Sequence, residues 1–206
     1  MSRLITNAIR STSATADAIT MDGSGNVTFP ANATCSGTAT GFGGGKLLQV
    51  QQGGSNVASS ASVASQATYD TGIQVSITPS SASSKILIIA TISGTTSSAI
   101  NNFAMTLQKK TGSGSFANIT EANGVVEGNR YSSMSGTYGT SIYTNYGVHF
   151  NYLDTAGSTD TLIYRGAYFN SSSATRTVYI NRSHTDDNSY SYTRGSSWIQ
   201  VMEIAA

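Results

Sequence analysis

Side chains that could carry acid–base chemistry are few and scattered in this sequence. The histidines are His149 and His184, and the glutamates are Glu121, Glu127 and Glu203. Glycoside hydrolysis needs two carboxyl groups that flank the scissile bond, and the spacing of these glutamates does not predict such a pair. The patterns of nucleophilic serines, phosphate-binding loops and zinc peptidases are also missing. We therefore expect a protein that is not an enzyme and needs no cofactor.

The segment that begins at His184 is the polar cluster best suited to contact a ligand. It reads HTDDNSYSY over residues 184–192, so Asp186 and Asp187 precede Tyr190 and Tyr192. Clustered oxygens can hold a hard cation, but this segment lacks the glycine and the distal glutamate of the twelve-residue calcium loop. A plain polar turn is the favoured interpretation, and we predict no metal site.

Tyrosines are concentrated in the second half of the chain. Ten of the eleven lie between Tyr131 and Tyr192. A tyrosine ring combines a large apolar area with a polar tip, so it suits strand packing as well as contact with a protein or a sugar. Packing is the favoured role for most of them, including those of the predicted strand 141–150.

Residues 73–94 predict the strands that would position these loops. Ile73, Val75 and Ile77 alternate with polar residues, as in a strand with one buried and one wet face. Residues 86–92 are apolar on both faces, short and rich in β-branched side chains. A buried helix is the alternative, but these features favour a strand, and we expect it to be the central strand of the core.

The rest of the chain from residue 46 onward predicts further short strands separated by glycine- and serine-rich turns. The complete set of expected strands is 46–52, 73–78, 86–93, 102–110, 115–119, 141–150, 159–169, 175–181 and 198–204. Many short strands with regular turn signals are typical of sandwiches. We expect an all-β fold with a jelly-roll-like β-sandwich over residues 46–206, a hairpin around residues 111–114 and an excursion loop over 121–139.

Residues 1–45 differ in character and predict an extended amino-terminal arm. Residues 18–21 and 26–29 flank an Asp-Gly-Ser-Gly turn, which indicates a β-hairpin. A lone hairpin of this size buries too little apolar surface to be stable in water, so we expect it to need a partner. The glycine-rich residues 41–45 are typical of a hinge.

Composition excludes several classes of protein. Charged residues make up 10% of the chain and the net charge is +1, whereas 33 residues are serine and 27 are threonine. No cluster of Lys and Arg could neutralise phosphates, so we expect no nucleic acid partner; the pair Lys109 and Lys110 is interpreted as the solvated end of a strand. The single cysteine, Cys35, precludes a disulfide within the chain. Neither a membrane-spanning segment nor the start of a signal peptide is expected.

Several segments resemble tail-fibre-like proteins of bacteriophages, especially those of marine and freshwater phages that infect cyanobacteria. The segments are SRLITNAIR at residues 2–10, DAITMDGSGNVTF at 17–29, KLLQVQQ at 46–52, residues 72–93 with SITPSSASSKILI, and WIQVMEIAA at 198–206. They bracket nearly the whole chain, while residues 100–194 resemble the family only in general character. None of these segments carries a catalytic residue.

The resemblance implies a structural protein of the virion, made in the host cytoplasm, that forms a homotrimer and acts as a short tail fibre or fibre tip. In this interpretation residues 1–45 bind other virion proteins, and the anchoring candidates are Leu4, Ile5, Ile9, Ile19, Met21, Val27 and Phe29. The globular part faces a glycan or protein of the host surface, because rigid scaffolds present recognition loops. The receptor-facing candidates are Tyr131, Tyr138, His184, Asp186, Asp187, Tyr190 and Tyr192.

Two alternatives remain for the function. A capsid decoration or head-fibre protein would use the same arm to grip the shell. A depolymerase of host polysaccharide is disfavoured, because trimeric enzymes of that kind need long repeats that this chain lacks.

Overall fold

The computed structural model describes residues 8–10, 12–13, 15–17, 19–29, 47–98, 102–128, 130–138, 141 and 143–206. The chain divides into two compact units, Met1–Gly44 and Gly45–Ala206. All regular structure in the described ranges is β-strand, and the larger unit is a sandwich, so the predicted all-β sandwich fold is confirmed.

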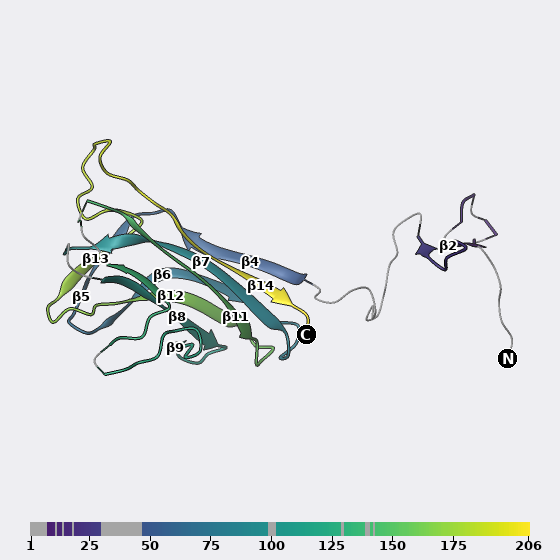
Figure 1. Cartoon of the computed structure of the whole chain (residues 1–206), viewed down its shortest axis with the longest axis horizontal. Helices are drawn as coiled ribbons and strands as arrows, with labels where there is room; N and C mark the ends of the chain where they lie inside the picture. The colour runs from purple at the N-terminus through teal and green to yellow at the C-terminus, as the bar shows by residue number, and fades with distance from the viewer. Residues whose placement is uncertain are drawn as a thin grey trace. The chain divides into compact units, whose positions relative to one another are not determined.

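Two antiparallel sheets form the larger unit (Figure 1). The first sheet has the order β10 (Ser135–Tyr138), β8 (Asn102–Thr111), β12 (Leu162–Phe169) and β6 (Thr68–Ile77), with β9 (Ala117–Asn118) also paired to β8. The second has the order β4 (Leu47–Ser55), β14 (Ser197–Ile204), β7 (Lys85–Thr96), β13 (Arg176–Ile180) and β5 (Ser59–Val63), with β11 (Tyr146–Thr155) also paired to β7.

Strand β7 is the central strand of the second sheet, as its hydrophobicity predicts. One edge pairs with β11 over residues 85–94, and the other edge is shared by β14 and β13. Ile86, Ile88 and Ile92 are fully buried against the first sheet. The opposite face is not covered within the described chain, since Ile89 is 42% exposed.

The core lies between the two sheets. Alternation in β6 buries Ile73, Val75 and Ile77, as predicted, and β12 adds Tyr164 and Tyr168. Further buried side chains come from β8, β11, β13 and β14: Phe103, Met105, Leu107, Val148, Phe150, Val178, Ile180, Ile199 and Val201. Strands β6, β7, β8, β11, β12, β13 and β14 are therefore fixed by inward-facing apolar residues.

The sandwich has two distinct ends. At one end Leu47, where the chain enters β4, pairs with Ile204, and Ile204 pairs with Lys85; we call this the arm end. At the other end Ser55 pairs with Ser197, where the long loop 182–196 joins β14; we call this the loop end. Figure 1 draws the arm end on the right of the sandwich and the loop end on the left.

Some predicted strand limits are wrong, each because cross-strand pairing overrides the local sequence. The strand expected at 141–150 is β11, which continues to Thr155 because Tyr152 and Leu153 pair with β7. The expected excursion loop at 121–139 contains β10, which pairs with the start of β8. Strand β5 was not predicted, since Ser59–Val63 is mostly small and polar. The hairpin at 111–114 is confirmed, although β9 has only two residues.

The described part of the smaller unit is a three-stranded antiparallel sheet of β1 (Ala8–Ile9), β2 (Ile19–Met21) and β3 (Val27–Thr28). The hairpin of β2 and β3 is confirmed, whereas β1 was not predicted. Asp22 fixes the turn: its carboxylate accepts hydrogen bonds from the backbone N–H groups of Ser24 and Asn26 and from the Asn26 side chain. The Asn26 side-chain hydrogen bond is the main cause that lowers the pKa of Asp22.

Candidate functional site

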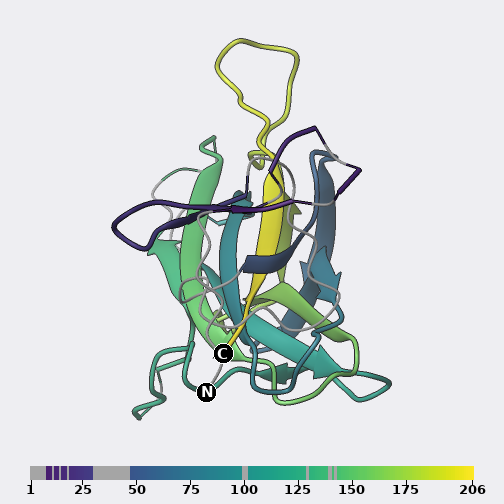
Figure 2. The same ribbon diagram turned by 90° about the vertical axis from the view of Figure 1, so that its right-hand side faces the viewer.

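The loop 182–196 between β13 and β14 is the most prominent feature of the loop end. Figure 2 shows it rising clear of the two sheets. Its base is held by Asn181, whose side chain donates to the backbone oxygens of Ser55 and Val57 and accepts from the hydroxyl of Ser197. A loop that projects from a fixed base can present side chains without disturbing the core.

Asp186 organises this loop. Its carboxylate accepts hydrogen bonds from the Arg194 guanidinium, at 2.6 Å for the shorter contact, and lies 3.6 Å from a guanidinium nitrogen of Arg182. The Arg194 hydrogen bond is the main cause that lowers the pKa of Asp186. The Asp186 carboxylate, which the sequence suggested as a possible cation ligand, is therefore paired with the guanidinium groups of Arg194 and Arg182. These ion pairs cross-link the loop.

The remaining loop candidates differ in exposure. Asp187 and Tyr192 line a hollow of about 330 Å³ together with Asp186 and Arg194. Tyr190 is fully exposed. His184 is half-buried, with its ring centroid 5.0 Å from that of Tyr179, so it packs at the base of the loop.

Two further tyrosines named from the sequence lie in the first sheet or beside it. Tyr131 stacks on Phe169 with ring centroids 3.3 Å apart, next to a hollow of about 380 Å³ that Arg130 also lines. Tyr138 is 58% exposed and pairs with Asn102 at the start of β8.

The fold brings these separate segments to one end of the sandwich. Strand β7 runs toward the loop end, and β8 is the next strand in the chain. Asn102, at the start of β8, therefore lies at the loop end, where Phe103 lies against Gly94. Phe169 lies there as well, because β12 pairs antiparallel with β8. Sequence reasoning missed Tyr143, which is 55% exposed and has its ring centroid 6.1 Å from that of Tyr192. The concentration of tyrosines after residue 131 was the signal, but a predicted strand at 141–150 assigned Tyr143 to packing.

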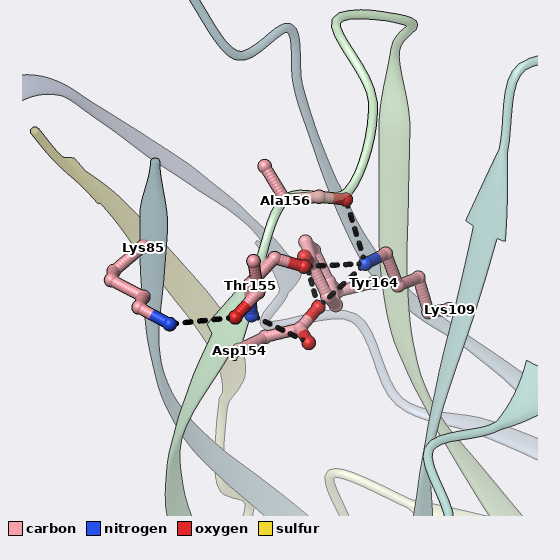
Figure 3. Close-up of polar contacts among 6 residues, drawn as sticks. All are labelled: Lys85, Lys109, Asp154, Thr155, Ala156 and Tyr164. Atoms are coloured by element: carbon pink, nitrogen blue, oxygen red, sulfur yellow. Dashed lines mark hydrogen bonds and ion pairs between the residues drawn. The ribbon is translucent and has the colours of Figure 1, made fainter. Parts of the chain in front are cut away.

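A second polar cluster lies at the arm end (Figure 3). The Lys109 ammonium donates to the Asp154 carboxylate at 2.8 Å and to the backbone oxygens of Thr155 and Ala156, each at 3.0 Å. The Tyr164 hydroxyl donates to the same carboxylate at 2.7 Å. Burial is the main cause that raises the pKa of Tyr164, and the charge of Asp154 adds to it.

This cluster fastens the sheets together. Lys109 and Tyr164 belong to the first sheet and Asp154 to the second, and the ion pair is mostly buried, with side chains 20% and 14% exposed. The interpretation of Lys109 as a solvated strand end is therefore wrong, because β11 extends far enough to place Asp154 opposite it. The adjacent hollow of about 470 Å³ is lined by Asn118 and Glu121, but the ammonium and the carboxylate are already engaged within the chain.

The anchoring candidates of the smaller unit fall into two groups. Ile9, Val27 and Phe29 are 46%, 52% and 44% exposed, respectively. Ile19 and Met21 of β2 are half-buried. Leu4 and Ile5 lie outside the described residues. A sheet this small with so much exposed apolar surface fits the expectation that it needs a partner.

Comparisons with known proteins add no family. No family model matches the chain, and no curated protein matches it in sequence. Within the described ranges, no helix is long and apolar enough to cross a membrane. Among those same residues, no group of three or more His, Cys, Asp or Glu side chains could hold a metal ion.

Proposed function

We propose that this chain is a structural protein of a bacteriophage virion, a homotrimeric short tail fibre or fibre-tip subunit that mediates attachment to the host surface. Residues 1–45 bind other virion proteins, and the loop end of the sandwich contacts a glycan or protein of the host.

The observation that carries this proposal is that the loop 182–196 lies at the end of the sandwich opposite to the point where the chain enters it. The chain enters from the arm at Leu47, and Ser55 at the other end of β4 pairs with the residue that closes the loop 182–196. Strands rise by about 3.3 Å per residue, so the nine residues of β4 separate Leu47, where the chain enters the sandwich, from Ser55 at the loop end by roughly 26 Å. An attachment protein needs this arrangement, with recognition directed away from the particle.

The chemistry of the loop end supports a surface that binds hydroxyl-rich or protein ligands. Tyr138, Tyr143 and Tyr190 are exposed there, and the loop also carries the ion-paired carboxylate of Asp186. Aromatic rings with polar neighbours are enriched at recognition surfaces because they bury a large area with little loss of side-chain freedom.

Labelling of intact virions with an antibody against residues 47–206 tests the proposal. We expect label on the tail alone. Label spread over the whole shell would refute the fibre and support a capsid decoration or head-fibre protein. The exposed apolar residues of the small sheet could bind a capsid subunit as well as a tail protein. Absence of label from purified virions would refute both.

A further inference from the structure

The outer face of the second sheet carries an apolar row that nothing in the described chain covers. Leu153 of β11, Leu87 of β7, Met202 of β14 and Val50 of β4 lie directly opposite one another across four adjacent strands. Leu153 is 52% and Val50 48% exposed, and the two central side chains are half-buried by their neighbours. The row crosses the sheet near the arm end.

Neighbouring rows extend this surface in both directions along the strands. Toward the arm end, Leu47 pairs with Ile204 and is 53% exposed. Toward the loop end, Ile89 is 42% and Trp198 38% exposed. We call this surface the outer patch; its members are Leu47, Val50, Leu87, Ile89, Leu153, Trp198, Met202 and Ile204.

The outer patch is unusual for a solvated sheet face. Antiparallel sheets with one wet face alternate apolar and polar residues, as β6 does with Gln74 and Ser76 pointing outward. The outer face of the first sheet is polar as well, since Arg165 donates hydrogen bonds to Gln108 and Asp70 there. Strand β7 instead has the pattern of a strand covered on both sides, and the described chain covers only one.

The charge of the surface favours another copy of this chain as the cover. In the four rows between Lys85 and Thr91, Lys85 is the only residue with a formal charge; the other positions are apolar, Gly, Thr, Asn, Gln or His. Such a face meets its own copy with little like-charge repulsion, because each copy brings only Lys85, at the arm-end edge of the rows. Apolar patches of about 300–600 Å² are already the largest on typical monomers and are often functional.

The outer patch includes the point where the chain enters the sandwich, since Leu47 is both the first residue of β4 and a member of the patch. We propose that in the trimer, which itself rests on the proposed function, the outer patches of three copies pack against one another around a closed three-fold axis.

The single tryptophan of the chain, Trp198, reports on this contact without any substitution. Light scattering over a dilution series gives the mass of the full-length protein, and acrylamide quenching of tryptophan fluorescence gives the accessibility of Trp198. We expect a trimer whose Trp198 becomes more quenchable as dilution dissociates it. A Trp198 equally quenchable in trimer and monomer would overturn the inference, as would a protected Trp198 in a monomer, which would indicate that the chain covers its own patch.

Matched substitutions separate this surface from the rest of the molecule. Ile89→Glu with Leu153→Glu places two carboxylates in the contact, and we expect the trimer to dissociate at concentrations at least about a hundredfold higher than for the wild type. Val125→Glu with Val126→Glu adds the same charge at side chains 91% and 65% exposed outside both sheets, and should leave the trimer intact. Circular dichroism of all proteins verifies that the fold is retained.

The outcomes distinguish this inference from the proposed function. If the wild type is trimeric and the Ile89 and Leu153 variant dissociates no more readily, the inference falls while the fibre assignment stands. If the wild type is monomeric at every concentration, the inference and the trimer fall together. Virion labelling then decides separately whether the chain belongs to the tail.

Discussion

Glu203 shows how a single buried carboxylate joins β14 to β4 and to the turn before β7. It lies inward on β14 and is fully buried, and it accepts hydrogen bonds from the Gln49 side chain at 2.6 Å and from the backbone N–H and hydroxyl of Ser80 at 2.8 and 2.7 Å. Burial alone would raise the pKa of Glu203, but these hydrogen bonds outweigh it and lower the pKa to about 2. The serine-rich turn before β7 is therefore a carboxylate-binding turn.

A pH dependence of stability follows from this residue. Because the folded pKa lies below the ordinary value of 4.5, the ionised carboxylate stabilises the fold above about pH 4.5, and this contribution is lost as the pH falls toward 2. Its size is about 3 kcal/mol. We expect Glu203→Gln to lower the free energy of unfolding by about 2–3 kcal/mol at pH 7 and the gap to the wild type to close near pH 2.

Urea unfolding at several pH values measures this effect. Glu127→Gln is the matched control, since the side chain is 81% exposed, and its effect should stay within about 0.5 kcal/mol. A gap between wild type and Glu203→Gln that does not change with pH would contradict the assignment.

The ion pair of Lys109 and Asp154 gives a second prediction for single residues. Breaking a buried pair costs about 3–5 kcal/mol, and the partial exposure of this one reduces the expected loss for Lys109→Met to about 2 kcal/mol. Lys85→Met is the control, because Lys85 is exposed and donates only to the Thr155 hydroxyl in this cluster. Thermal unfolding compares the two, and equal losses would show that Lys109 does not fasten the sheets.

At the scale of elements, the hydrophobic pattern predicted the strands that form the core. The remaining strands are determined by cross-strand pairing. Alternation at Ile73, Val75 and Ile77 and the apolar run at 86–92 were sufficient to predict β6 and β7. Strands β5 and β10 could not be predicted, because most of their residues are small or polar and their structure comes from hydrogen bonds to β13 and β8.

The candidate surfaces were predictable by residue type but not by position. The polar loop at 184–192 and the cluster of tyrosines were visible in the sequence. Position depends on the fold, because β13 ends and β11 and β14 begin at the loop end. This arrangement allows the ion pairs of Asp186 with Arg182 and Arg194 and brings Tyr143 close to Tyr192.

Close packing of three strands at Gly94 predicts a strong effect of one methyl group. A Cβ at this position would overlap the backbone oxygen of Tyr179 and the ring of Phe103. We expect Gly94→Ala to lower the free energy of unfolding by about 3 kcal/mol. At Gly124 the nearest atom to such a Cβ is the Ser133 backbone oxygen at 3.4 Å, so Gly124→Ala should be near neutral; chemical denaturation that ranks the two alike would contradict this packing.

The loop 182–196 should carry recognition if the proposed function holds. We expect virions with Tyr190→Ala and Tyr192→Ala to adsorb to host cells at least about tenfold more slowly, because aromatic anchors dominate recognition surfaces. Val125→Ala and Val126→Ala remove exposed apolar side chains from another loop and should leave adsorption unchanged. Equal adsorption of both variants would remove the loop from the receptor-facing surface.

At the scale of the whole molecule, the two units have separate tasks in the proposed fibre. The larger unit has its own core between two sheets, whereas the small sheet exposes Ile9, Val27 and Phe29. We expect deletion of residues 1–45 to leave a folded sandwich, seen by circular dichroism, that no longer joins virions. Incorporation of the truncated protein into particles would show that the anchor lies elsewhere.

A density map of the assembled virion tests the central claim most directly. The account predicts three copies of the sandwich around one axis at the tail, with the outer patches turned inward and the loop 182–196 directed away from the particle. Sandwiches distributed over the capsid lattice, or a loop end buried against another virion protein, would contradict it.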